Sequence, residues 1–156
     1  MNSIQALWEK GQCIILNGVM YANGSVELVK AYDLPRPVGT LSLPFLEQTS
    51  LDWNKTCEIT TLIPSCRSED LSRGVVAIGG EGGMGGDGFL ALTDVANRLL
   101  WIAFFDFSNP FVFVEIARSE IIAKNNLEES WHFQIAKPSQ IIVEVPPEAG
   151  FRSRTI

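Results

Sequence analysis

The stretch RGVVAIGGEGGMGGDGFLALTDVANRLLWIAFFDF, residues 73–107, decides between two classes of fold. Seven of the ten residues from Gly79 to Gly88 are glycine. A glycine-rich turn that follows an apolar strand and opens a helix is typical of a phosphate-binding loop in a nucleotide enzyme. A glycine-rich segment between two strands is instead a hairpin loop, which is typical of β-rich proteins.

The stretch matches the dinucleotide-binding fingerprint in several respects. VVAIGG supplies the strand, and Gly80, Gly82 and Gly85 then form the pattern G-x-G-x-x-G. Asp106 lies 21 residues beyond Gly85, close to where an acidic residue would bind the ribose hydroxyls. This interpretation requires residues 86–98 to form a crossover helix with the pyrophosphate at its N-terminus.

Other features favour a hairpin. The segment that should be a helix begins with GDG and carries no helical stripe of apolar residues. The rest of the chain shows no βαβ unit, and the Gly-Lys-Ser/Thr of a Walker loop does not occur. We therefore expect a long, mobile loop that joins a strand at Val75–Ile78 to a strand at Phe89–Thr93. The alternative is a nucleotide-binding or NAD-dependent enzyme that uses the Gly79–Gly88 loop. The fingerprint also leaves four further glycines unexplained: Gly79, Gly83, Gly86 and Gly88.

Short apolar and β-branched runs separated by turn residues fill the rest of the chain. A short helix is expected at residues 3–10, and Asn-Gly pairs at 17–18 and 23–24 each predict a type I′ hairpin turn. About ten short strands predict a mainly β fold, an antiparallel sandwich or curled sheet with one or two short helices. Besides those already named, strands are expected at 13–16, 19–22, 25–32, 99–107, 111–118, 131–136 and 140–145.

Prolines divide the first half of the chain. Three prolines between residues 35 and 44 predict an extended connection with no room for a regular helix. Pro64 is expected to end a strand within residues 56–63, and the polar segment Ser65–Arg73 is predicted to be a loop.

The length of 156 residues predicts one globular domain over residues 1–147, followed by a loose tail at 148–156. The run LLWIAFF, residues 99–105, is apolar at every position. It predicts a strand that is covered on both faces, or whose second face meets a partner. The run is much shorter than the roughly 20 residues of a membrane helix, and the N-terminus does not resemble a secretory signal.

The formal net charge is −6, which disfavours binding to a nucleic-acid backbone and suits a basic protein partner. The same charge also keeps a protein soluble without any partner. The three cysteines, Cys13, Cys57 and Cys66, form no CxxC pair. An odd cysteine count without such a pair argues against a disulfide framework or a zinc site and favours a reducing cytoplasm.

No residue pattern predicts catalysis, a cofactor or a metal. His132 is the only histidine, and a catalytic pair between it and one of the cysteines has no local signature. The chain contains no G-x-S-x-G and no two-histidine metal motif. We therefore expect a protein that acts by binding and not as an enzyme.

Acidic residues dominate the centre of the chain. From Gly74 to Ala117 there are five acidic residues and one basic residue, Arg98. If these side chains share one edge of the fold, they form a negative patch for a basic partner. The residues predicted to bind a partner are those of the glycine loop and the neighbouring acids: Glu69, Asp70, Glu81, Met84, Asp87 and Asp94.

A small, acidic, mostly β domain without a catalytic set resembles the immunity proteins of bacterial toxin systems, including those of contact-dependent growth inhibition. The segment GFLALTDVANRLLWIAFFDFSNPF, residues 88–111, carries this resemblance best. It implies a cytoplasmic inhibitor that binds a cognate toxin domain, in many cases a nuclease with a basic active site. No residue role is carried over from it. A third hypothesis is a structural subunit whose apolar strands at 99–117 pair with another chain.

Overall fold

The computed structural model describes residues 3–32, 37–53, 55 and 57–147, and the predicted tail at 148–156 lies outside them. The described chain is mainly β, with three antiparallel sheets and one short helix, which confirms the predicted fold class. In chain order the elements are α1 (Ile4–Glu9), β1 (Gln12–Ile14), β2 (Gly18–Tyr21), β3 (Ser25–Val29), β4 (Gly39–Ser42), β5 (Phe45–Ser50), β6 (Ile59–Thr61), β7 (Ile63–Asp70), β8 (Val75–Glu81), β9 (Gly88–Asp94), β10 (Leu99–Phe105), β11 (Phe111–Ile116), β12 (Glu120–Asn125), β13 (Ser130–Gln134) and β14 (Ile141–Val145).

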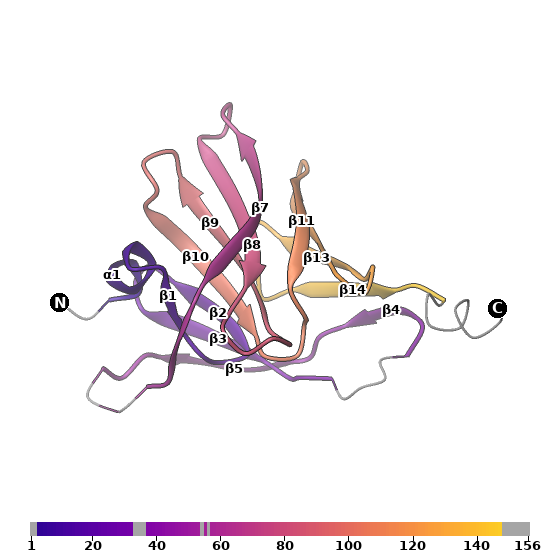
Figure 1. Cartoon of the computed structure of the whole chain (residues 1–156), viewed down its shortest axis with the longest axis horizontal. Coiled ribbons are helices and arrows are strands. Elements are labelled where there is room, and N and C mark those ends of the chain that lie inside the picture. The colour runs from indigo at the N-terminus through magenta and orange to yellow at the C-terminus, as the bar shows by residue number, and fades with distance from the viewer. Residues whose placement is uncertain (1–2, 33–36, 54, 56, 148–156) are drawn as a thin grey trace.

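A seven-stranded sheet in the order β5-β3-β2-β10-β9-β8-β7 forms the middle of the molecule. A five-stranded sheet in the order β11-β12-β13-β14-β4 covers one of its faces. The helix α1 and the two-stranded β1-β6 ribbon cover the other face. Figure 1 shows this arrangement, with α1 and β1 on one side of the central strands and β11, β13 and β14 on the opposite side.

The strand β10 takes part in both hydrophobic cores, which explains its unbroken apolar sequence. Trp101, Ala103 and Phe105 face the core between the two large sheets. Ile102 and Phe104 face the core beneath α1 and the β1-β6 ribbon. Because β10 also lies between β2 and β9, both of its edges are paired within the chain. The prediction of a strand covered on both faces is thus confirmed, and β10 has no free edge for another chain.

The glycine-rich stretch forms a hairpin, as predicted, because β8 and β9 pair antiparallel from Val75 opposite Asp94 to Gly80 opposite Phe89. The strands extend further into the glycines than expected, so the loop contains only residues 82–87. The crossover helix required by the dinucleotide interpretation does not form, because residues 88–94 are a strand.

The two Asn-Gly pairs have different structures, and neither forms the predicted type I′ turn. Gly18 is the first residue of β2, and β1 pairs with β6 instead of with β2. At the second pair only Gly24 has a positive φ, of 91°, while Asn23 does not. The β2-β3 hairpin therefore closes through a three-residue loop with glycine at the left-handed position.

The predicted loop at Ser65–Arg73 is wrong, since residues 63–70 form β7, an edge strand of the central sheet. Pro64 lies inside this strand beside a register shift, which an edge strand tolerates. Two polar side chains of β7 form hydrogen bonds with the backbone of β11. Ser65 Oγ donates to the Phe111 carbonyl over 2.8 Å, and Ser68 Oγ accepts from the Ile116 amide over 3.2 Å.

Besides β7, three strands, β4, β5 and β12, have no counterpart among the predicted elements. The predicted helix at residues 3–10 is confirmed as α1, which begins after Ser3, whose hydroxyl caps the Ala6 amide. Within the described residues, no helix is long and apolar enough to cross a membrane.

Candidate protein-binding surface

The glycine loop, residues 82–87, is held in one conformation by a buried carboxylate. Asp87 is fully buried, and its side chain accepts hydrogen bonds from the amide of Gly82 over 2.9 Å and the amide of Met84 over 3.3 Å. Gly83 donates its amide to Thr60 Oγ1 over 2.8 Å, and the Gly86 carbonyl accepts from the Asn109 amide. The loop is therefore ordered, contrary to the expectation of a mobile segment.

Close packing accounts for much of the glycine content. A Cβ atom at Gly80 would lie 2.1 Å from the carbonyl oxygen of Ile63 on β7. One at Gly88 would lie 2.4 Å from the carbonyl oxygen of Asn109. Such distances are far below a van der Waals contact, so these positions need glycine for backbone approach and not for phosphate binding.

Around this loop three apolar side chains are exposed to solvent. Ile59, Ile63 and Met84 are 46%, 48% and 49% exposed. Ile59 is next to Thr60, which holds the loop, and Ile63 lies opposite Glu81 in the β7-β8 register. We call the surface formed by Glu58, Ile59, Ile63, Glu81, the glycine loop and Asp106 the loop end.

The acidic side chains of the loop end have no partner of opposite charge. Within the described residues, Glu58, Glu81 and Asp106 make no ion pair and no side-chain hydrogen bond. Glu58 and Asp106 are exposed and Glu81 is half-buried. Asp106 is beside the loop, since its carbonyl oxygen is the nearest atom, at 3.9 Å, to a Cβ built on Gly86. The loop end thus combines exposed apolar side chains with unpaired negative charges.

The opposite end of the central sheet, which we call the turn end, contains the β7-β8 and β9-β10 turns. Here Asp70 accepts from Ser72 Oγ and pairs with Arg73 at 2.5 Å. These contacts lower the pKa of Asp70 to about 2. Asp94 accepts from the amides of Arg98 and Ala96 and pairs with the Arg98 side chain, which also lowers its pKa.

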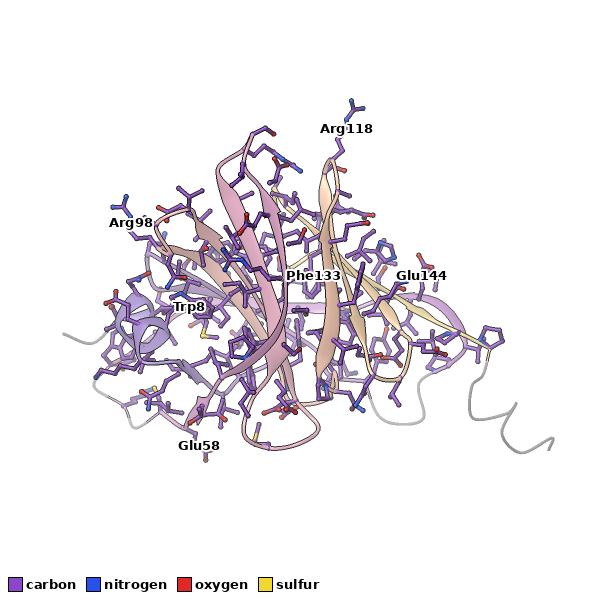
Figure 2. All side chains as sticks on the ribbon, turned by 45° about the horizontal axis from the view of Figure 1, so that its top comes forward. Trp8, Glu58, Arg98, Arg118, Phe133 and Glu144 are labelled. Atoms are coloured by element: carbon purple, nitrogen blue, oxygen red, sulfur yellow. The ribbon has the colours of Figure 1, made fainter. Side chains whose placement is uncertain are left out.

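The six residues predicted to bind a partner are therefore divided between two ends of the sheet. Glu81 and Met84 lie at the loop end, where Asp87 stabilises the loop from inside and presents no carboxylate to the surface. Asp70 and Asp94 lie at the turn end, and Glu69 pairs with Arg67 nearby at 2.7 Å. In Figure 2, Glu58 lies at one end of the molecule, and Arg98 and Arg118 lie at the other.

Sequence reasoning did not assign Glu58, Ile59, Ile63 or Asp106 to this surface. Asp106 entered the sequence analysis as a ribose ligand and as one of five central acidic residues that could form a negative patch, and the two isoleucines entered it only as parts of a strand. Exposed and less exposed side chains alternate along β6 and β7. This pattern arises because β7 is an edge strand of the central sheet and β6 belongs to the two-stranded ribbon, so it depends on strand order. The sequence contains no signal for that order.

The geometry around the histidine and the cysteines does not form a nucleophilic pair. His132 lies on the outer face of the five-stranded sheet between Glu120, 3.1 Å from Nδ1, and Glu144, 2.8 Å from Nε2. The Glu144 oxygen lacks hydrogen-bond geometry with Nε2, so that contact is an ion pair only when the ring is protonated. Burial raises the pKa of the Cys13 and Cys66 thiols, which makes them poor nucleophiles.

The described residues contain no cluster of three or more histidine, cysteine, aspartate or glutamate side chains able to hold a metal ion. Comparison of the chain with protein-family models, with curated proteins and with solved structures finds no match. The surface chemistry of the molecule is therefore the basis for inferring its function.

Proposed function

We propose that the protein is a cytoplasmic immunity protein that binds and neutralises a toxin domain through the loop end. The observation that carries this proposal is the combination of exposed Ile59, Ile63 and Met84 with the unpaired carboxylates around them. An apolar centre surrounded by charge is the usual anatomy of a protein–protein interface.

The charge of this surface identifies the class of partner. Unpaired carboxylates attract a basic surface over distances up to about the Debye length of the solution. This attraction increases the rate at which the two proteins associate. A nuclease has a basic active site, so a nuclease toxin would offer the complementary charge. The overall net charge of −6 acts in the same direction.

An ordered loop supports tight binding. Because Asp87 and Thr60 already fix the glycine loop, binding does not have to restrict a flexible segment. A preorganised surface loses less conformational entropy on association, and affinity increases accordingly. Three free cysteines support the cytoplasmic part of the proposal, because thiols persist in a reducing compartment.

The reading frame immediately upstream of the gene supplies the test. Its C-terminal domain would be purified and titrated with this protein by calorimetry, and its toxic activity would be measured with and without the protein. We expect nanomolar binding, loss of toxic activity, and an affinity that falls as salt is added from about 50 to 500 mM. A metabolic gene at that position, or a basic domain that neither binds nor is inhibited, would contradict the proposal.

A further inference from the structure

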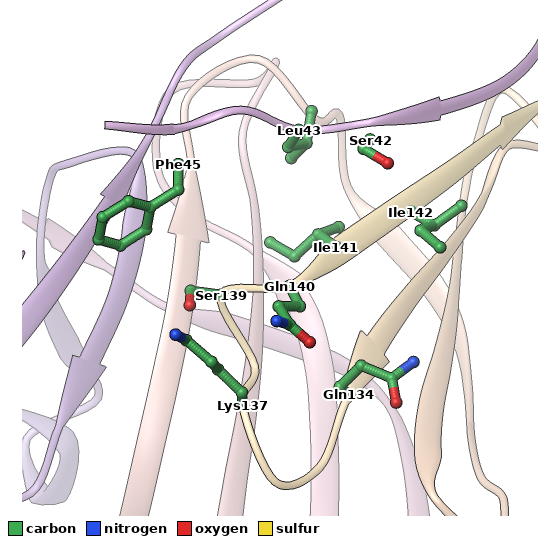
Figure 3. Close-up of a pocket in the computed structure, with 9 residues that line it drawn as sticks. All are labelled: Ser42, Leu43, Phe45, Gln134, Lys137, Ser139, Gln140, Ile141 and Ile142. Atoms are coloured by element: carbon green, nitrogen blue, oxygen red, sulfur yellow. The ribbon is translucent and has the colours of Figure 1, made fainter. Parts of the chain in front are cut away.

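A cavity of about 530 Å³ lies between the β4-β5 connection and the β13-β14 turn. Figure 3 shows the side chains that line it. Leu43 and Ile141 are buried and supply an apolar wall, while Phe45 and Ile142 are partly exposed. The volume lies in the range of cavities that hold small molecules.

One lining group is buried without a hydrogen-bond partner. Ser139 is 3% exposed, and its hydroxyl is one of only two buried side-chain polar atoms without a partner in the described part of the chain. A buried hydroxyl without a hydrogen-bond partner destabilises the folded protein. A ligand atom that accepts a hydrogen bond from this hydroxyl would remove that loss of stability, which favours binding.

The charge of the cavity is opposite to that of the chain. None of the described residues that line the cavity is acidic, although the chain has 18 acidic residues and only 12 basic ones. Lys137 stands at the rim, with its Nζ atom 6.0 Å from the centre of the Phe45 ring, and no described carboxylate pairs with it. Gln134 and Gln140 add amide groups beside it.

The rim is fixed by its own backbone. The amide of Lys137 donates to the Gln134 carbonyl over 3.2 Å, and the amide of Gln140 donates to the Lys137 carbonyl over 2.9 Å. The backbone that carries Lys137 and Gln140 is therefore fixed at the rim of the cavity without a ligand.

We propose that this cavity binds a small organic anion with an apolar chain, whose carboxylate contacts Lys137 and Ser139 and whose chain packs against Leu43, Phe45 and Ile141. A free small molecule suits a space of this volume. This site is separate from the loop end and does not depend on the function proposed above.

The test is a titration of the isotope-labelled full chain with octanoate, followed by its amide resonances, beside a titration with octan-1-ol. Octanoate is expected to shift resonances of Gln134, Gln140 and Ile141 with a dissociation constant of about 1 mM or tighter. Octan-1-ol, which lacks the charge, is expected to bind about tenfold more weakly.

Two variants and a control sharpen this test. Lys137→Gln is expected to weaken octanoate binding about tenfold, and Ser139→Ala about threefold with little loss of stability. The control is Lys124→Gln, because Lys124 also lies over a phenylalanine ring, Phe113, but does not line this cavity. The proposal is overturned if octanoate shifts none of these resonances at 5 mM, if octan-1-ol binds equally well, or if Lys137→Gln binds like the wild type.

Discussion

The two ends of the central sheet differ in how their acidic side chains are used. At the turn end, Asp70 and Asp94 form hydrogen bonds and ion pairs within their own turns. At the loop end, Glu58, Glu81 and Asp106 have no such partners among the residues that the structure describes. Exposed apolar side chains occur at both ends, with Leu71 and Val95 at the turn end, so the difference lies in the pairing of the carboxylates. Acidic side chains therefore form contacts within the fold at the turn end and remain available for a partner at the loop end.

The difference also concerns what joins the sheets. At the turn end, Arg73 contacts Asp70 and donates to the carbonyls of Ala117 and Arg118 in the β11-β12 turn. Its positive charge thus serves both a turn and the contact between two sheets. At the loop end the contact is made by uncharged backbone groups: the Asn109 amide bonds to the Gly86 carbonyl, and Gly88 packs against the Asn109 carbonyl. This contact uses none of the carboxylates.

The largest expected effect is on the packing of the loop end. Gly88→Ala would place its Cβ 2.4 Å from a backbone oxygen, so we expect a loss of about 2–4 kcal/mol in the free energy of unfolding. The control is Gly86→Ala, where the nearest atom is 3.9 Å away and φ is not positive; it should change stability by less than about 1 kcal/mol. Urea unfolding of both variants measures the contrast, and equal losses would refute a packing role for the glycines.

A smaller effect is expected from the carboxylate that holds the loop. Asp87→Asn keeps the size of the side chain but replaces one acceptor oxygen by a donor that faces a backbone amide. We expect unfolding to become easier by about 1–3 kcal/mol, together with faster amide exchange at Gly82 and Met84. Unchanged exchange at these two amides would show that the loop does not depend on Asp87.

The smallest effect belongs to the turn end and appears as a pH dependence. The pKa of Asp70 falls from an ordinary value of 3.8 to about 2 on folding, so its ionised form stabilises the protein above about pH 4. That contribution is lost as the pH falls through about 2. The stability difference between wild type and Asp70→Asn should therefore shrink between pH 4 and pH 2. A difference that stays constant over this range would exclude the ionised Asp70 as its cause.

Local patterns predicted the hairpin and the central strand well. The unbroken apolar run LLWIAFF and the glycines between two apolar segments are properties of adjacent residues, and adjacent residues form β8, β9 and β10. The β7 strand was missed because it is an edge strand whose polar side chains bond to β11, a partner more than 40 residues away. Polar composition alone does not distinguish such a strand from a loop.

The candidate surface was predictable only in part for the same physical reason. Glu69 and Asp70 are close to the glycine loop in the sequence, but β7 runs away from the loop, so Asp70 lies at the opposite end of the sheet. Glu58 and Asp106 are far apart in the sequence, but Glu58 directly precedes β6, whose Thr60 bonds to the glycine loop, and Asp106 directly follows β10 and lies beside Gly86. Strand length and strand order decide these positions, and single-sequence patterns contain little information about either.

The most direct test of the account exchanges charges at the two ends separately. One variant carries Glu81→Lys and Asp106→Lys. The matched variant carries Glu69→Lys on β7 and Glu115→Lys on β11, beside Ile116, whose amide bonds to Ser68 of β7. All four are surface or strand-end positions away from the cores. The affinity of each for the toxin domain encoded upstream is compared with that of the wild type. We predict that the loop-end variant binds about 100-fold more weakly and the matched variant within about threefold of wild type. Equal weakening by both, or weakening by the matched variant alone, would contradict the assignment of partner binding to the loop end.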